Sequence, residues 1–426
     1  MVKWVGRAGG KRLFQLMGVL VTSAALLVAS PSNAMAASKA PVLDESILGG
    51  VPYVSGVDSK SWPSIVSQAA VVMDMNTGAI VYAKNPLAEH YPASITKIMT
   101  ALLALKYGKL SDRLTASKNA VNQPPDKLYM VPGEVEELEP LLYGLLLDSA
   151  NDAAVDIAEH YGGSVSKFAT MMNDEAKSLG ATHTHFDNPN GLPDPKHQTT
   201  AYDMAVIARA AMQYPEFRKI VQTKYYDWKG KAWQSKLENL NTMLFYYPGC
   251  IGLKTGFTSV AHETLVVAAK RGTDTFLAVL MDNPTDYSIR HDASQLLDYA
   301  FAHYETWTIV RKGQTVAELA GPKGTSVAVQ ATETVTATVP KDDAPQYHDS
   351  IEYAFLGHPM AKGSVIGTLE VEGANGKVLA SVPAQVGADL DPIEAIRVEY
   401  TLFPLAVLLS LLFVALGWIW VRRRNG

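Results

Sequence analysis

Ser94 and Lys97 lie three residues apart in a segment whose apolar pattern predicts a helix. Side chains at this spacing share one face of a helix, so the hydroxyl and the amine can share a proton. A serine becomes a useful nucleophile when a base removes its proton, and an amine can be that base if burial or a second cation lowers its pKa. The N-terminal end of the helix would add backbone N–H groups near an attacked carbonyl. This pair could therefore carry out acyl transfer.

The same spacing occurs a second time, at Ser164 and Lys167, directly after two glycines. Short motifs of this kind arise by chance in a long chain. The second copy has no matching partners farther along the chain. We therefore interpret it as accidental and take Ser94 as the candidate nucleophile.

Ser149 and Asn151 follow the apolar run 145–147 and precede a predicted helix. A turn at this point can hold a hydroxyl and an amide in fixed positions. Ser149 could pass a proton, and Asn151 could hold a peptide amide. The alternative is a helix cap with no further role, and the similar pattern at 117–119 shows that it also occurs by chance.

Lys254, Thr255 and Gly256 form the sharpest motif and lie on a predicted strand. A glycine in a strand allows a ligand to approach the backbone closely. The lysine charge and the threonine hydroxyl suit a carboxylate. The alternative is an edge-strand lysine beside a turn.

These residues fall in a region of strands at both ends and helices between them. Residues 70–82 read as a hairpin around 76–78, and a helix should run from 92 through 105, where Pro92 suits the first turn. Further helices are predicted at 134–147, 152–161, 168–179, 200–212 and 288–303, and further strands at 249–258, 263–270 and 274–281. This order predicts an α+β domain whose terminal strands meet in one antiparallel sheet beside a helical part.

The composition changes after this region. We place the predicted catalytic domain at residues 68–305 and a second, β-rich domain at 306–398, where Val, Thr and Gly occur in alternating patterns. The second domain could be a pedestal in front of a membrane helix, and a binding module is the alternative.

Both ends of the chain predict export and a membrane anchor. Residues 1–36 combine basic residues, an apolar run and a small-residue cleavage site, as in a signal peptide, with an uncleaved anchor as the alternative. Residues 37–67 read as an extended arm. Residues 402–421 are apolar throughout and predict a transmembrane helix, followed by a basic cytoplasmic tail at 422–426. The sequence thus predicts a single-pass cell-membrane protein whose catalytic domain lies on the extracytoplasmic face.

The composition, the net charge and the cysteine content exclude several classes of protein. Apolar side chains make up 48% of the chain, enough for a sizeable core, and the net charge of -5 without long basic runs argues against a nucleic-acid partner. Cys250 is the single cysteine, so an intramolecular disulfide is excluded and a small buried hydrophobe is expected. His183 and His185 lack a suitably spaced carboxylate and read as loop residues. We expect no metal and no cofactor.

The three motifs, in the order Ser-x-x-Lys, Ser-x-Asn and Lys-Thr-Gly, form the signature of penicillin-recognising serine enzymes. The chain resembles their low-molecular-mass D-alanyl-D-alanine carboxypeptidases from about residue 70 to 305, including 91–93, 149–153 and 188–192. The resemblance implies a β-lactamase/transpeptidase-like catalytic domain with an antiparallel sheet and a helical subdomain, a small all-β domain and a membrane anchor. It also implies peptidoglycan stem peptides as substrates and β-lactams as covalent inhibitors.

The resemblance implies a role for each motif residue. Ser94 attacks the carbonyl of the penultimate D-alanine and Lys97 takes its proton. Ser149 with Lys254 returns a proton to the leaving D-alanine, and water releases the acyl-enzyme.

The resemblance also implies the substrate contacts. The backbone N–H groups of the nucleophile and of Phe257 would form the oxyanion hole. Asn151 and Gly256 match substrate-binding positions, and Thr255 and Arg290 match the positions that hold the terminal carboxylate. A surface salt bridge is the alternative for Arg290.

The chain departs from the family pattern at His262, where relatives usually have a glycine after Ala261. A bulky side chain at this position could narrow the site, change the substrate preference or lie on the surface.

Three other functions are alternatives to that of a carboxypeptidase. A class A β-lactamase would have an acidic residue in place of Ala150 and a later glutamate loop that activates water, and we find neither. A D,D-endopeptidase that cuts cross-links would use the same residues with a different pocket. A catalytically silent wall-binding or sensor protein is the alternative outside enzymes, but the complete motif set argues against it.

Overall fold

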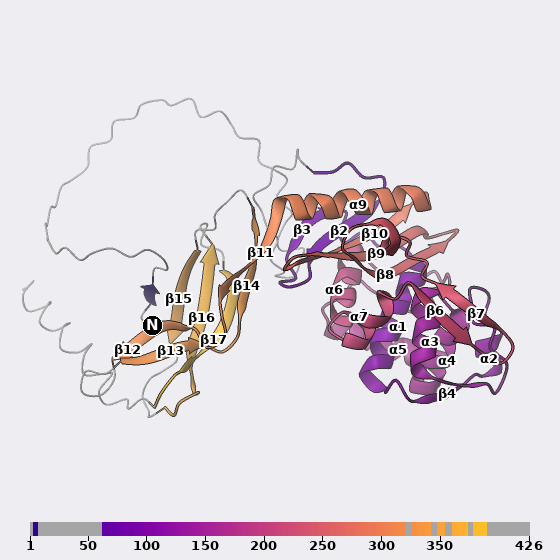
Figure 1. The fold of residues 1–426 in the computed structure, drawn as a ribbon, viewed down its shortest axis with the longest axis horizontal. Coiled ribbons are helices and arrows are strands. Elements are labelled where there is room, and N and C mark those ends of the chain that lie inside the picture. Colours follow the sequence, from indigo (N-terminus) through magenta and orange to yellow (C-terminus); the bar gives the residue numbers. More distant parts are fainter. Residues whose placement is uncertain are drawn as a thin grey trace, which may run out of the picture. The chain divides into compact units, whose positions relative to one another are not determined.

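The computed structural model describes residues 3–6, 62–320, 326–341, 347–353, 360–373 and 378–389. Two compact units divide these residues: one contains 62–306 together with 338–341, and the other contains the remainder (Figure 1). Most of the predicted signal peptide and arm, the predicted transmembrane helix at 402–421 and the tail at 422–426 lie outside the described residues. Within the described ranges, no helix has the length and apolarity that a membrane crossing requires.

The first unit is built around a five-stranded antiparallel sheet in the order β3-β2-β10-β9-β8. Its strands are β2 (Ala69–Asp74), β3 (Ile80–Lys84), β8 (Cys250–Thr258), β9 (His262–Arg271) and β10 (Asp274–Asn283). Because β2 pairs with β10 in register Val72 to Ala278, strands from both ends of the unit meet, as the sequence predicted. The edge strand β8 carries the Lys-Thr-Gly motif.

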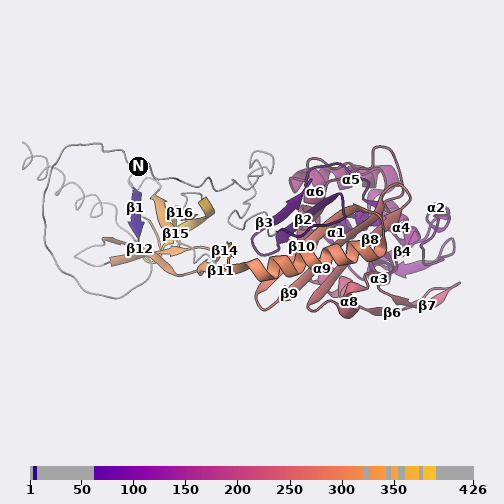
Figure 2. The same ribbon diagram turned by 90° about the horizontal axis from the view of Figure 1, so that it is seen from above.

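The sheet is buried on both faces. Successive residues of β2 alternate between two apolar clusters: Val71 and Met73 pack on one side, and Ala70 and Val72 on the other. Helix α9 (Asp286–His303) covers the second side with Leu296 among its buried residues (Figure 2). The helical part covers the first side. Because both faces are covered, the sheet is a rigid support for residues at its β8 edge.

The helical part contains the 3-10 turn η2 (Ala93–Thr96) and its continuation α1 (Lys97–Tyr107), which lies in the core. The other helices are α2 (Lys118–Val121), α3 (Leu138–Leu147), α4 (Asn151–Gly162), α5 (Val165–Ser178), α6 (Ala201–Ala211), α7 (Pro215–Val221) and α8 (Met243–Tyr246). Two small hairpins complete the unit: β4 (Arg113–Thr115) with β5 (Val135–Glu137), and β6 (Tyr225–Lys229) with β7 (Gln234–Glu238). Each longer predicted helix is present.

One helix begins later than the sequence predicted. The acidic start of the predicted helix 134–147 is strand β5, and α3 begins at Leu138. The reason is that the buried carboxylate of Glu134 accepts N–H groups of Val131 and Lys231, at 2.8 and 2.6 Å, and so anchors two loops. The acidic residue whose position predicted the first turn of a helix instead forms hydrogen bonds that hold two loops together.

The described end of the predicted arm is hydrogen-bonded to helix α9. The carboxylate of Asp292 on α9 accepts the backbone N–H groups of Val66 and Ser67, at 3.0 and 2.8 Å. Residues 62–67 are therefore fixed to the first unit.

The second unit is all-β within the described residues, as the sequence predicted. Its main sheet has the order β1-β15-β16-β17-β13-β12, with antiparallel neighbours. The strands are β1 (Lys3–Gly6), β12 (Thr315–Ala320), β13 (Ser326–Ala331), β15 (Tyr347–Tyr353), β16 (Val365–Gly373) and β17 (Val378–Val386). Strands β11 (Tyr304–Val310) and β14 (Val335–Pro340), each of which the boundary between the units divides, form a separate two-stranded sheet.

His262, the departure from the family glycine, begins β9 with φ of 54°. Glycine is the usual residue in this left-handed region, although histidine enters it more easily than most side chains do. The ring is 54% exposed, and its Nδ1 lies 2.6 Å from Asp282 Oδ1 at the end of β10. The ring therefore lies on the surface and joins two adjacent strand ends.

We predict that His262→Val lowers the free energy of unfolding by about 1–2 kcal/mol, because a β-branched residue is strained at positive φ. His262→Gly should change it by less than about 1 kcal/mol, since relief of backbone strain offsets the lost surface contact and the greater freedom of the unfolded chain. Thermal unfolding of both variants measures the order. Equal stability of the two would show that the backbone conformation is not what selects the residue.

Candidate active site

Ser94 is presented by the short turn η2 at the start of α1. The preceding residue, Ala93, is buried with φ of 51°, a conformation that alanine rarely adopts. The loop that contains Gly191 presses on this turn, since a Cβ atom on Gly191 would lie 1.9 Å from the carbonyl oxygen of Ala93. Close backbone contact thus holds the turn that carries the nucleophile.

The amine of Lys97 is fully buried and lies beside three oxygen atoms. Its Nζ is 2.9 Å from Ser94 Oγ, 2.9 Å from Asn151 Oδ1 and 2.6 Å from the carbonyl oxygen of Asn190. The amide nitrogen of Asn151 donates to the carbonyl oxygens of Pro124 and Pro125, so the amide oxygen must face the lysine. Two of the three partners can therefore only accept hydrogen bonds from the amine.

This arrangement suits a base. A neutral amine has two N–H groups and one lone pair, so it donates to Asn151 and Asn190 and directs its lone pair at the Ser94 hydroxyl. After the amine accepts the serine proton, it has three N–H groups for the same three oxygens. The proton transfer requires no rearrangement.

Burial and a second lysine favour the neutral form of the amine. Burial, followed in effect by the charge of Lys254, holds the pKa of Lys97 well below its ordinary value of 10.5, although Asp126 and Asp152 act in the opposite direction. Burial also lowers the pKa of Lys254 to about 8, while Asp126 and Asp148 support its charge. A pKa of about 8 leaves Lys254 largely protonated near neutral pH.

Strand β8 packs directly against the nucleophile turn. A Cβ atom on Gly256 would lie 2.7 Å from the backbone nitrogen of Ser94 and 2.5 Å from Thr264 Oγ1. Thr264 Oγ1 is also 2.9 Å from the carbonyl oxygen of Pro92. The glycine was expected to admit a ligand, but in the structure it admits the start of the nucleophile's own helix.

Ser149 lies buried at the turn between α3 and α4, with φ of 62°. The turn is fixed by the N–H of Asn151, which donates to the carbonyl oxygen of Asp126 at 2.7 Å, and by the N–H of Ala150, which donates to that of Gly144 at 3.0 Å. The neighbouring Asp148 has a pKa raised to about 6 by burial and by Asp126, with Lys254 acting in the opposite direction. Nothing in the sequence singled out Asp148 except its place before Ser149.

The sequence also missed His197, which supports the helix that carries Lys97. Burial lowers the pKa of His197 to about 4, so its ring is neutral. Its Nδ1 accepts the N–H of Asp187 at 3.0 Å, which leaves Nε2–H to donate to Thr96 Oγ1 at 2.9 Å. This bond fixes the residue beside Lys97.

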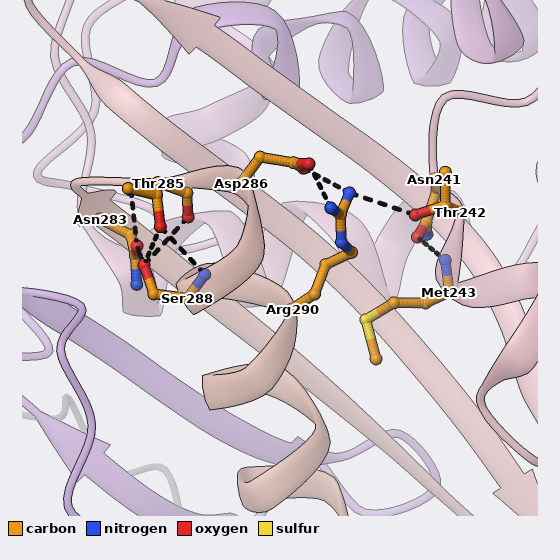
Figure 3. A network of polar contacts seen from close by, with 8 residues as sticks. All are labelled: Asn241, Thr242, Met243, Asn283, Thr285, Asp286, Ser288 and Arg290. Carbon is orange, nitrogen blue, oxygen red and sulfur yellow. Dashed lines mark hydrogen bonds and ion pairs between the residues drawn. The ribbon is translucent and has the colours of Figure 1, made fainter.

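Two other predicted residues lie at the β8 edge or near it. The side chain of Phe257 is 62% exposed, which leaves the end of β8 accessible to solvent. Arg290 extends from α9 and contacts both carboxylate oxygens of Asp286, and its Nη1 donates to Thr242 Oγ1 at 3.2 Å (Figure 3). The salt bridge considered for Arg290 is therefore present.

The second Ser-x-x-Lys copy has a local role. Ser164 caps α5, because its Oγ accepts the N–H of Lys167 at 3.2 Å. Ser117 caps α2 in the same way. Neither serine contacts a buried amine. Across the described ranges, no group of three or more His, Cys, Asp or Glu side chains is placed to hold a metal ion.

Family models match both parts of the chain. The model described as D-alanyl-D-alanine carboxypeptidase matches residues 57–285, and the C-terminal domain of penicillin-binding protein 5 matches 304–391. The D-alanyl-D-alanine carboxypeptidase DacF of Bacillus subtilis is 34% identical over 76% of this chain and 86% of its own length.

Solved structures agree with these matches. Penicillin-binding protein 5 from Haemophilus influenzae superposes with a TM-score of 0.69 at 32% identity, over 79% of this chain and 100% of its own. A mutant of the Streptomyces K15 DD-transpeptidase has a TM-score of 0.54 at 31% identity and covers 57% of this chain and 100% of its own. The order of the three motifs, the geometry around Lys97 and these matches agree, and the chain belongs to the family of serine D-alanyl-D-alanine carboxypeptidases.

Proposed function

We propose that this chain removes the terminal D-alanine from peptidoglycan pentapeptide stems through an ester on Ser94. The observation that carries the proposal is the buried amine of Lys97, whose lone pair can face Ser94 Oγ because two acceptors fix its other contacts. The family membership supplies the reaction, and this geometry supplies the base.

In the acylation step, Ser94 Oγ attacks the carbonyl carbon of the penultimate D-alanine and its proton passes to Lys97. The C–N bond breaks, and the leaving amine receives a proton through Ser149 and Lys254. Water then attacks the ester, releases the shortened stem and restores the serine hydroxyl. The charged form of Lys254 near neutral pH suits the role of proton donor.

The N–H groups of Ser94 and Phe257 would stabilise the developing oxyanion. The close packing of Gly256 against Ser94 supports this assignment, because it brings the end of β8 beside the nucleophile. Thr255 and Arg290 would hold the terminal carboxylate. Asn151 would act partly through Lys97, since both ends of its amide are hydrogen-bonded.

We also propose that residues 1–36 direct export and that residues 402–421 anchor the protein in the cell membrane with the catalytic domain outside. The basic and apolar patterns of both segments support this. Fractionation of cells that express the full chain and a chain ending at residue 401 tests the anchor: loss of the truncated protein from the membrane is expected, and equal retention would contradict it.

One prediction concerns the nucleophile. Purified protein should release D-alanine from a pentapeptide stem and react covalently with fluorescent penicillin, and Ser94→Ala should abolish both. Ser164→Ala is the matched control and should leave both unchanged. Release of monomer from a cross-linked dimer without release of D-alanine would favour the endopeptidase alternative, and labelling that persists in Ser94→Ala would exclude Ser94.

Another prediction concerns pH. The rate constant for penicillin acylation should fall on the alkaline side near pH 8, as Lys254 loses its proton. Asp148 raises the pKa of Lys254, so Asp148→Asn should lower that pKa and move the alkaline limb to lower pH. Asp174→Asn, which removes an exposed carboxylate on α5, is the control. A limb that moves to higher pH in Asp148→Asn would contradict the assignment.

A further inference from the structure

The guanidinium of Arg290 already holds a carboxylate. Asp286 and Arg290 lie four residues apart in the first part of α9, and each Asp286 oxygen contacts a different terminal nitrogen of Arg290. Figure 3 shows the guanidinium between this carboxylate and the hydroxyl of Thr242. Two parallel contacts of this kind are the geometry in which arginine binds a carboxylate most specifically.

The pair lies beside the end of the strand that carries the Lys-Thr-Gly motif. Glu263, the register partner of Phe257, has its pKa raised by burial and by Asp286 and lowered by Arg290, so both charges act at this point. On the other side, the segment of Thr242 is joined to the Ser149 turn, since the N–H of Leu240 donates to the carbonyl oxygen of Leu147 at 3.1 Å. Arg290 thus acts on Glu263, opposite Phe257 of β8, and contacts Thr242, whose segment is hydrogen-bonded to the end of α3.

We propose that Asp286 is an internal competitor for the carboxylate subsite: it occupies the guanidinium fork that the terminal carboxylate of a stem peptide must use. This inference rests on the proposed function, because it assumes that Arg290 receives that carboxylate. The substrate would have to displace Asp286 or share Arg290 with it. Asp286 would then lower the affinity for peptides with a free C-terminal carboxylate and leave other peptides unaffected.

The contact between Asp286 and Arg290 is weak enough for the carboxylate of a substrate to displace it. The Asp286 side chain is 57% exposed and that of Arg290 is 26% exposed, so water can replace either partner. Exposed ion pairs of this kind contribute little, which sets the expected change in affinity at roughly two- to fivefold.

The test measures binding without turnover, in the full chain with Ser94→Ala. The probe is a diacetyl-lysine peptide that ends in D-alanyl-D-alanine, and its C-terminal carboxamide is the neutral counterpart. Calorimetric titration should give a Kd for the acid that is roughly two- to fivefold lower in Asp286→Asn, while the Kd for the carboxamide stays unchanged. The KM for D-alanine release from the acid should fall by the same factor with Ser94 intact, with kcat nearly unchanged.

Two further variants separate this effect from a general change of charge or fold. Asp298→Asn removes another exposed carboxylate on α9, which contacts Arg271 at 2.7 Å, and should leave both Kd values unchanged. In an Arg290→Gln background, Asp286→Asn should no longer favour the acid, because the fork is gone.

The proposal is overturned if Asp286→Asn leaves the Kd of the acid unchanged or raises it, or if the carboxamide gains as much affinity as the acid. It is also overturned if the gain persists with Arg290→Gln. A shifted Kd, combined with no release of D-alanine by the protein in which Ser94 is intact, would overturn the proposed function and leave Asp286 as the competitor. Normal D-alanine release without a shifted Kd would leave the proposed function standing and overturn the role of Asp286 as the competitor.

Discussion

The amine of Lys97 is buried without a carboxylate in contact and lies close enough to a second buried lysine for the two charges to repel. A buried ammonium is unfavourable unless it is paired, so the folded chain favours the neutral amine. The same neutral amine is what a serine nucleophile needs as its base. The fold must therefore bring α1, the turn before α4, the Asn190 loop and strand β8 to one point, and each of these elements contributes one contact or charge.

Close backbone packing fixes this point. Gly191 brings its loop against the carbonyl oxygen of Ala93, and Gly256 brings β8 against the nitrogen of Ser94. A side chain at either position would move the nucleophile away from its base. The packing of the protein itself therefore requires glycine in the Lys-Thr-Gly motif, whether or not a ligand is bound.

The sequence predicted the central sheet, the longer helices and the residues around Lys97. Apolar periodicity is a local property of the sequence, and the order of the three motifs can be read directly along the chain. It did not predict the carbonyl oxygen of Asn190 as a partner of Lys97, since a backbone atom leaves no mark on residue type. Asp148 and His197 were missed because their effects depend on burial, which arises only in the folded chain. Glu134 was misplaced in a helix because its carboxylate is used by loops that are distant in sequence.

The charged groups in the interior of this site and those at its surface differ in their exposure to water. The buried lysines have altered pKa values because water is absent, whereas Arg290 and Asp286 lie partly in water. The first arrangement sets the reactivity of Ser94, and the second would adjust the affinity for a carboxylate. The two can therefore change independently when residues are substituted.

The ionisation of Lys97 is the most direct test of this account. Carbon-13 labelling of lysine Cε atoms, with assignment through Lys97→Arg, allows its titration to be followed by NMR. We expect a midpoint for Lys97 well below 10.5 that rises in Lys254→Gln, because Lys254 is one of the two causes of the lowered pKa. A midpoint at or above 10.5, or one that does not respond to Lys254→Gln, would contradict it.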